Sequence, residues 1–173
     1  MTLPGGTADH RANARALESL RCAVVTVSDS RTEATDESGA LMRTLLTGAG
    51  HSVAHYALLR NDEPAITAHL RELLAMELDV VLLTGGTGLG SRDRTVEAVR
   101  AVLQKELPGF GELFRMLSYQ EQIGTAAILS RAVAGGAHGI FVVSLPGSRA
   151  AVELALTRIL LPELRHVVWE LRR

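Results

Sequence analysis

The sequence predicts an α/β fold built on an open and mostly parallel sheet. Segments rich in β-branched residues alternate along the chain with segments whose apolar residues recur at helical spacing, as in folds made of repeated strand–helix–strand crossovers. The composition agrees with this class. Of the 173 residues 47% are hydrophobic but only 3% are aromatic, so the core must be aliphatic, as is typical of a parallel sheet covered by helices.

The composition also narrows the classes of function. The formal net charge is −1 and no dense basic stripe is present, which argues against nucleic acid as the main partner. No segment reaches the ~18 uninterrupted apolar residues of a membrane span, and the N-terminus lacks the apolar centre of a signal peptide. The single cysteine, Cys22, lies in an apolar run, so we expect it to be buried and inert, consistent with a reducing cytoplasm.

We expect a single domain. Residues 1–14 are polar and contain Pro4, Gly5 and Gly6, so they are predicted to form a disordered tail. Residues 15–173 are predicted to form the domain, and a chain of this length buries roughly 70% of its unfolded surface. Residues 14–20 are compatible with a short helix before the first strand.

The first half of the domain predicts two strands, each followed by a helix. Residues 22–27 and 53–59 have the β-branched or alternating apolar pattern of strands. Asp36 predicts the N-cap of a helix that ends near Thr47, because two glycines follow closely. Pro64 fits the first turn of the next helix. The apolar stripe of that helix consists of Ile66, Leu70, Leu73 and Leu74.

The third strand, over residues 79–83, is the most apolar and is expected at the centre of the sheet. A helix is predicted from Thr95 to about Glu106, and the Pro-Gly-Phe-Gly sequence of residues 108–111 should end it. A shorter helix is predicted over residues 112–117.

The last third of the chain predicts one strand and two helices. Residues 125–134 are ambiguous between helix and strand, and the glycine-rich residues 135–139 predict a turn. Residues 140–145 predict the fourth strand. A wide apolar helix is expected over residues 150–160, and Pro162 begins the last helix, which has apolar residues at helical spacing.

The most informative segment is residues 84–92, which read Thr-Gly-Gly-Thr-Gly-Leu-Gly-Ser-Arg. This glycine loop directly follows the central strand. Glycine permits close approach of the backbone and positive φ values, and a strand, a glycine-rich turn and a helix N-terminus together create an anion site from N–H groups. The alternative is a tight turn without a ligand.

Ser91 excludes the two common phosphate-binding motifs. A P-loop that starts at Gly85 needs lysine at position 91, and a dinucleotide fingerprint that starts at Gly86 needs its third glycine there. Neither a P-loop enzyme nor a dinucleotide dehydrogenase is therefore supported. The backbone and the hydroxyl groups of the glycine loop can still contact a phosphate.

Acidic residues at the strand exits indicate a divalent cation. Asp29, Asp62 and Asp93 follow strands, at the sheet edge where ligands bind in open α/β folds. A carboxylate about 4 Å from a phosphate charge is repelled by roughly 4 kcal/mol at an effective dielectric constant near 20. Mg²⁺ removes this repulsion, since it takes one or two carboxylates plus phosphate oxygens. The alternatives are that Asp62 and Asp93 only cap helices and that Asp29 only shapes its loop.

The remaining polar candidates carry weaker signals. Arg92 and Arg94 either neutralise phosphate or stay solvated, and Glu112 either binds a polar heterocycle or caps its helix. Ser28 and Ser148 have no His or Lys partner in the sequence, so we interpret them as hydrogen-bond donors rather than nucleophiles. The six histidines lack metal-ligand spacing and are expected at the surface.

Seven short motifs occur in a fixed order along the chain. They are Thr26-Val-Ser-Asp29, Asp36-x-Ser-Gly39, Thr84-Gly-Gly-Thr-Gly88, Arg92-Asp93-x-Thr95-x-Glu97-Ala98, Pro108-Gly-Phe-Gly-Glu112, Leu129-Ser-Arg131 and Leu145-Pro-Gly-Ser148. Over about residues 20 to 170, this ordered set resembles the MoaB/Mog family of molybdenum-cofactor biosynthesis proteins, and its spacing is closer to the MoaB branch. Val96 departs from the family pattern, which usually has proline after the threonine.

The resemblance implies a three-layer α/β/α sandwich, the molybdopterin-binding MoaB/Mog fold, assembled as a trimer or hexamer. It also implies that the chain binds molybdopterin, acts in the cytoplasm and meets other molybdenum-cofactor biosynthesis proteins. In active members, molybdopterin attacks the α-phosphate of ATP in the presence of Mg²⁺, and the products are adenylyl-molybdopterin and pyrophosphate. The alternative within the same family is a non-catalytic molybdopterin-binding or scaffolding oligomer.

The resemblance also assigns roles to residues. Asp62 and Asp93 match the catalytic pair, which would also hold the metal. The residues expected to bind nucleotide or pterin are Ser28, Asp29, Thr84, Gly85, Gly86, Thr87, Gly88, Arg92, Gly111, Glu112, Ser130, Pro146, Gly147 and Ser148.

Overall fold

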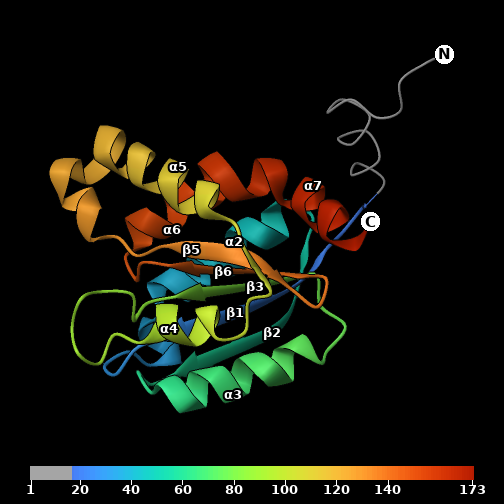
Figure 1. Cartoon of the computed structure of the whole chain (residues 1–173), viewed down its shortest axis with the longest axis horizontal. Coiled ribbons are helices and arrows are strands. Elements are labelled where there is room, and N and C mark those ends of the chain that lie inside the picture. The colour runs from blue at the N-terminus through green and yellow to red at the C-terminus, as the bar shows by residue number, and fades with distance from the viewer. Residues whose placement is uncertain (1–16) are drawn as a thin grey trace.

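The computed structural model describes residues 17–173, and a six-stranded sheet crosses the whole domain (Figure 1). The strands are β1 (Arg21–Val27), β2 (Ser52–Leu59), β3 (Val80–Thr84), β4 (Lys105–Glu106), β5 (Val133–Ala137) and β6 (Ile140–Leu145). The α-helices are α2 (Glu37–Gly48), α3 (Glu63–Leu74), α4 (Thr95–Arg100), α5 (Pro108–Ser118), α6 (Arg149–Ala155) and α7 (Leu161–Arg172). Shorter helical segments are η1 (Glu33–Thr35), η2 (Tyr119–Ile123), η3 (Gly124–Leu129) and η4 (Leu156–Leu160).

The sheet is mostly parallel, as the sequence predicts. Its strand order is β2-β1-β3-β6-β5-β4. The pairs β1–β2, β1–β3 and β3–β6 are parallel, whereas β5 is antiparallel to β6 and β4 is antiparallel to β5. The β5–β6 hairpin turns through His138 (φ 52°) and Gly139 (φ 76°), and positive φ at both turn residues matches the twist of the flanking strands.

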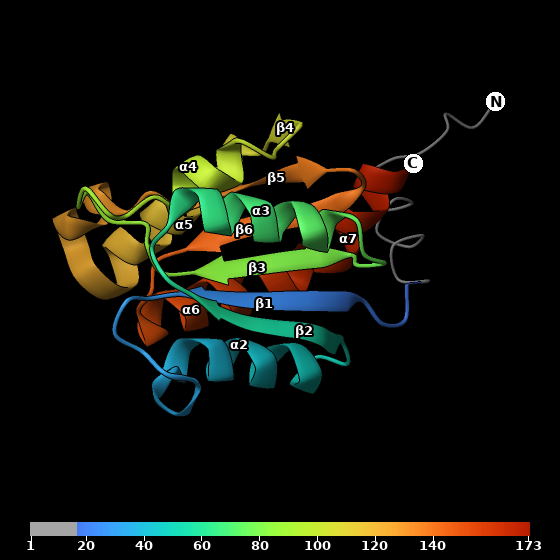
Figure 2. The ribbon, with the colours of Figure 1, turned by 90° about the horizontal axis from the view of Figure 1, so that it is seen from below.

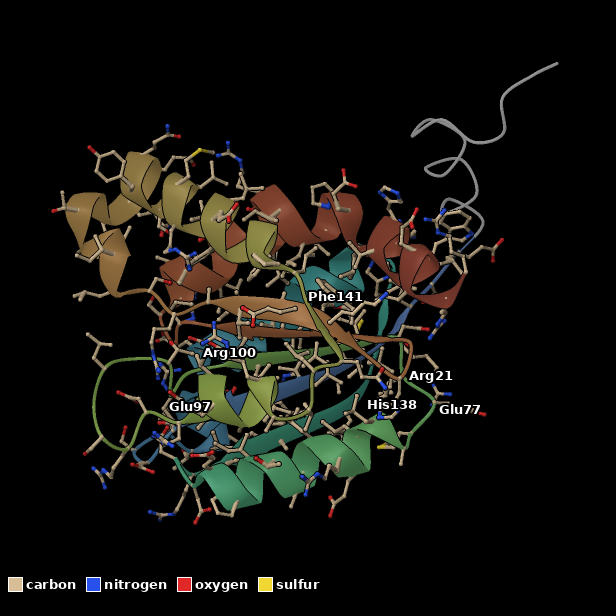
Figure 3. All side chains as sticks on the ribbon, in the orientation of Figure 1. Arg21, Glu77, Glu97, Arg100, His138 and Phe141 are labelled. Carbon is tan, nitrogen blue, oxygen red and sulfur yellow. The ribbon has the colours of Figure 1, made fainter. Side chains whose placement is uncertain are left out.

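Helices cover both faces of the sheet, which confirms the three-layer sandwich (Figure 2). One apolar cluster packs α2, α5, α6 and α7 on the face that carries Val24 and Phe141. The other packs α3 and α4 on the face that carries Val25. Figure 3 shows Phe141 between the sheet and the layer formed by α2, α5, α6 and α7. Within residues 17–173, none of the helices combines the length and the apolarity that a membrane crossing requires.

Two predicted helix boundaries were wrong, and they lie on either side of the edge strand β4. Helix α4 ends at Arg100 rather than near Glu106, because residues 105–106 pair with β5 instead. Helix α5 begins at Pro108 rather than at Glu112. The N–H groups of the first helical turn have no partner within the helix, so proline, which lacks this group, fits there. The Pro-Gly-Phe-Gly sequence, which was expected to end a helix, therefore begins one.

The predicted turn over residues 135–139 was also wrong, because residues 133–137 form β5 and only His138 and Gly139 turn. The glycines of β5 serve close approach: a Cβ on Gly135 would collide with the backbone oxygen of Lys105. The ambiguous residues 125–134 divide into the end of η3 and the start of β5.

The N-terminal predictions fall partly outside the described residues. The predicted tail, residues 1–14, lies there, as does the beginning of the possible helix over residues 14–20. Residues 17–20 are described and are not helical.

The expectation that the histidines lie at the surface was wrong for His51. This residue is buried, and its Nδ1 accepts a hydrogen bond from the Leu20 N–H at 3.2 Å.

Candidate functional site

The loops that follow β1, β2, β3 and β6 meet at one end of the sheet and line a single pocket of about 740 Å³ (Figure 1). This volume suits a small organic ligand. The residues predicted for the site that do line this pocket are Ser28, Asp29, Gly85, Gly86, Thr87, Gly88, Asp93, Ser130, Pro146, Gly147 and Ser148. It does not include Asp62, Thr84, Arg92, Gly111 or Glu112.

The glycine loop needs glycine for its backbone conformation. Gly85 has φ 94° and Gly86 has φ 63°, values that side chains with a Cβ rarely adopt. A Cβ on Gly86 would also collide with Asn61 Oδ1 and Thr95 Oγ1. Both of these oxygens are buried and have no hydrogen-bond partner, so two polar atoms converge on this point of the loop.

Asp93 lies over the same loop. Its Oδ2 accepts a hydrogen bond from the Gly90 N–H at 3.2 Å. A Cβ on Gly88 would lie only 2.7 Å from Oδ2. The N-cap of α4 is Arg94, so Asp93 does not cap that helix and its carboxylate belongs to the loop.

The first amide of α4 is also occupied. The Thr95 N–H donates to the Gly86 oxygen at 3.0 Å, and α4 has only six residues. The expected contribution of this helix N-terminus to an anion site is therefore small, and residues 85–88 are the part of the loop that lines the pocket.

Asp29 joins the exits of β1 and β2. Its Oδ1 accepts the Asn61 N–H at 3.0 Å, and Arg92 Nη1 lies 3.5 Å from its Oδ2. The pKa of Asp29 is lowered, first by the backbone hydrogen bond from Asn61 and to a smaller extent by Arg92. Asp29 is therefore a negative charge in the pocket at neutral pH, and Arg92 pairs with it from outside.

The other predicted residues have structural contacts beside or beneath the pocket. Asp62 is exposed, and its Oδ1 caps α3 by accepting the Ala65 N–H at 3.0 Å, as the capping alternative predicts. Thr84 is buried and donates to the Pro146 oxygen at 2.9 Å. Gly111 is buried and Glu112 exposed on α5.

Two serines expected to donate hydrogen bonds to a ligand also accept hydrogen bonds from the backbone. Ser28 Oγ accepts the N–H of Arg31 at 3.1 Å, and Ser148 Oγ accepts the N–H of Ala151 at 3.2 Å as the N-cap of α6. These bonds orient both side chains at the pocket wall. The Oγ of Ser130, which also lines the pocket, is buried without a partner.

Sequence reasoning missed three residues that build the pocket. Arg31 lines it and donates to the Gly147 oxygen at 2.9 Å, and Asn61 contributes the buried Oδ1 described above. Arg131 holds the glycine loop from behind. Its guanidinium donates to the backbone oxygens of Thr87 and Asp93 at 2.9 and 2.8 Å. Their signal in the sequence was position only: Arg131 ends the Leu129-Ser-Arg131 motif, Asn61 directly precedes Asp62, and Arg31 follows Asp29 by two residues.

Arg131 is fixed in turn by Glu97 of α4. Nη1 of Arg131 lies 2.5 Å from Oε1 of Glu97, and Figure 3 shows Glu97 on this helix at the loop end of the sheet. The hydrogen bond from Arg131 is the main reason why the pKa of Glu97 is lowered. The glycine loop is thus attached to α4 through a charged pair.

The acids of the pocket do not form a complete metal site by themselves. Across residues 17–173, no group of three or more His, Cys, Asp or Glu side chains is arranged to hold a metal ion. A cation in this pocket would share its coordination with oxygens of a bound phosphate, which is the usual arrangement for Mg²⁺.

Comparisons with known proteins identify the family. Residues 23–166 match the family model described as "Probable molybdopterin binding domain". Molybdenum cofactor biosynthesis protein B of Halalkalibacterium halodurans is 52% identical over 155 residues, which cover 89% of this chain and 91% of that protein. The same protein of Bacillus subtilis is 50% identical over 155 residues, with the same coverage.

A solved structure agrees with these relatives. The crystal structure of a molybdenum cofactor biosynthesis protein B has a TM-score of 0.87 and 50% identity, and the match covers 90% of this chain and 97% of that one. The pocket-lining loops lie within the matched residues 23–166. The chain therefore belongs to the molybdopterin-binding MoaB/Mog family of molybdenum cofactor biosynthesis proteins.

Proposed function

We propose that this chain binds molybdopterin and ATP in the pocket and catalyses Mg²⁺-dependent adenylylation of molybdopterin. Membership of the family supports a role in molybdenum cofactor biosynthesis. The observation that carries the finer proposal is the placement of the Asp93 carboxylate on a glycine loop that lines the same pocket as the exits of β1, β2 and β6.

The reaction needs positioning more than covalent chemistry from the protein. A phosphate oxygen of molybdopterin forms a bond to the α-phosphorus of ATP. The bond from that phosphorus to the bridging oxygen breaks, and its electron pair leaves with pyrophosphate. Aligned donors that stabilise the charge on the phosphoryl oxygens supply most of the catalysis in such transfers. We assign this task to the backbone of residues 86–88 and to Arg31, which line the pocket.

The residues present fit the magnesium that the proposal requires. Asp29 and Asp93 line the pocket, and Asn61 Oδ1, which has no hydrogen-bond partner within residues 17–173, would supply a further oxygen. Mg²⁺ prefers such oxygens together with substrate phosphates. The bound ion would neutralise phosphate charge. In this proposal Asp93 and Asp62 form the catalytic pair. Asp62 directly follows Asn61 in the chain.

The test is product analysis with molybdopterin, ATP and Mg²⁺. We expect the wild-type protein to form adenylyl-molybdopterin and pyrophosphate in equal amounts. Asp93→Asn should lower turnover by about 10²-fold or more, because it removes a charge from the reacting centre. Asparagine can still accept the Gly90 N–H, so the loop should remain folded. Circular dichroism and the melting temperature check this.

The second variant, Asp62→Asn, separates catalysis from capping. Asparagine caps a helix about as well as aspartate, so a loss of turnover without a loss of stability would assign Asp62 to the reaction. Wild-type-like turnover of Asp93→Asn would refute the role of Asp93. If the wild-type protein binds molybdopterin but forms no adenylyl product, the non-catalytic alternative holds.

A further inference from the structure

Two histidines meet between β2 and α3, outside the residues that line the pocket. His55 is on the edge strand β2 and His69 is on α3, which covers that strand. Their Nε2 atoms are 3.1 Å apart. The ring centroids are 5.1 Å apart with planes tilted by 40°, so the rings meet through their nitrogen-bearing edges rather than by stacking of their faces.

The separation of the two nitrogens is within hydrogen-bond distance, and it also falls within the range that two nitrogen ligands of one metal ion span. Zn–N bonds of about 2.05 Å place two nitrogens about 2.9 Å apart at a 90° angle and about 3.3 Å apart at a tetrahedral angle. The observed 3.1 Å lies between these values. Imidazole suits Zn²⁺, Cu²⁺ and Ni²⁺, whereas Mg²⁺ and Ca²⁺ prefer oxygen.

The surroundings orient one of the two imidazoles. The other ring nitrogen of His69, Nδ1, lies 3.4 Å from Glu72 Oε2. A carboxylate at this place fixes the tautomer and increases the basicity of a histidine ligand.

We propose that His55 and His69 form a binding site for a Zn²⁺-like divalent cation, with water molecules as the remaining ligands and Glu72 as the carboxylate that orients His69. The side chain of His69 is 18% exposed and that of Glu72 is 75% exposed, so the site opens to solvent and water can complete the coordination. Two protein ligands define a site of lower affinity than a closed structural zinc site with four.

The site would connect the two elements that flank the exit of β2. His55 precedes the Asn61–Asp62 turn in β2, and His69 follows it in α3. A metal bridge between them closes this strand–turn–helix unit, which carries the pocket residue Asn61. Because the two ligands are brought together only by folding, cation binding should stabilise the folded state and raise the melting temperature.

Calorimetric titration of the metal-free protein with Zn²⁺ tests the proposal. We expect one Zn²⁺ per chain, and His55→Asn and His69→Asn should each weaken binding at least tenfold. Zn²⁺ should raise the melting temperature of the wild-type protein but not of these two variants. Mg²⁺ at the same concentration should not compete with Zn²⁺.

Two other histidines provide matched controls. His138 has φ 52°, a conformation that asparagine tolerates, and it lies in the β5–β6 turn, where Figure 3 labels it. His166 on α7 lies between Glu163 and Glu170, 3.0 and 3.8 Å from its ring nitrogens, so it is the competing candidate. His138→Asn and His166→Asn should both retain Zn²⁺ binding.

Nitrogen NMR gives a readout that is independent of stability. On addition of Zn²⁺, the Nε2 resonances of His55 and His69 should shift together, whereas those of His138 should stay unchanged. Loss of binding in His166→Asn, retention in both His55→Asn and His69→Asn, or unshifted Nε2 resonances would each overturn the proposal.

Discussion

The carboxylate of Asp93 accepts a hydrogen bond from the N–H of Gly90, three residues earlier in the chain, at 3.2 Å. The carboxylate therefore turns back over the glycine loop. Built Cβ atoms on Gly88 and Gly90 would lie 2.7 and 2.8 Å from its Oδ2. These two glycines thus leave room for the acid, whereas Gly85 and Gly86 provide the positive φ values of the turn.

Gly88→Ala tests this division of roles. The new methyl group would meet only the end of the Asp93 side chain, so we expect the carboxylate to move and the fold to remain. A displacement of about 1 Å in a reacting group can lower turnover about 10²-fold. Stability should change by no more than about 0.5 kcal/mol. Adenylylation assays and urea unfolding measure the two quantities.

Gly48→Ala is the control for this substitution. Gly48 is the last residue of α2, and nothing lies within 4 Å of its built Cβ. The free energy of unfolding of this variant should rise by about 0.5–1 kcal/mol because alanine favours the helix. Its turnover should not change. Equal activity of the Gly48 and Gly88 variants would contradict the role of the glycine loop in placing Asp93.

The parallel part of the fold could be predicted from the sequence because its signals are local. Strands β1 and β6 are apolar on both faces, so residues 22–27 and 140–145 were recognised without knowledge of their neighbours. Strand β4 contains only Lys105 and Glu106, which carry no strand signal. It exists because Gln104 and Leu107 donate their N–H groups to β5 at 2.9 and 2.7 Å, which only the tertiary structure shows.

The site, like the fold, could be predicted only where its residues are neighbours in the sequence. The glycines and Asp93 lie close together in sequence, so their association was readable from the spacing. Arg131 lies 38 residues from Asp93 and 44 from Thr87, and no local pattern connects it to them. Asp62 shows a different limit of prediction from sequence. It caps a helix, and a capping residue has the same local sequence whether or not it also acts in catalysis.

Arg131→Met should destabilise the domain and loosen the glycine loop. The guanidinium donates to two backbone oxygens and to Glu97, and a hydrogen bond to a charged group contributes about 1.5–3 kcal/mol. We expect a loss of about 3 kcal/mol in urea unfolding. Arg100→Met is the control, because its pair with Glu106 is exposed and should cost at most about 1 kcal/mol.

The same pair predicts the dependence of stability on pH. The pKa of Glu97 in the folded protein is lowered below 4.5, mainly by the hydrogen bond from Arg131. The charged pair therefore stabilises the fold fully above pH 4.5, and this stabilisation is lost as the pH falls through the lowered pKa. Unfolding measured from pH 7 down to pH 3 should show the difference between wild type and Arg131→Met shrinking. A constant difference would mean that the charge of Glu97 does not contribute and that the hydrogen bonds to the backbone oxygens and packing cause the loss.

Asp36→Ala should cost more stability than the other cap substitution, Asp62→Ala. Asp36 is buried and accepts hydrogen bonds from Thr26 Oγ1 at 2.6 Å and from the Tyr56 hydroxyl at 2.8 Å, in addition to capping α2. Removing it leaves the buried hydroxyl group of Thr26 and the half-buried hydroxyl group of Tyr56 without this acceptor. We expect about 3 kcal/mol for Asp36→Ala, against about 1 kcal/mol for the exposed cap Asp62.

Tyr56→Phe distinguishes the network from the cap. It removes one donor to Asp36 and leaves the cap intact, so it should cost about 1 kcal/mol. If Asp36→Ala costs no more than Asp62→Ala in the same urea titration, the buried hydrogen bonds contribute nothing beyond the cap.

Cys22 should be unreactive in the folded protein. It is fully buried in β1, and burial, with a smaller effect of Asp79, raises the pKa of its thiol to about 12. Because only the thiolate reacts, a disulfide reagent such as DTNB at pH 8 should label the native protein only as fast as the strand opens. In guanidinium the same sample should release one equivalent at once. The raised pKa also means that the stabilisation from this neutral thiol is intact below about pH 9 and is lost as the pH rises towards 12. Rapid stoichiometric labelling of the native protein at pH 8 would show that β1 is not the buried strand described here.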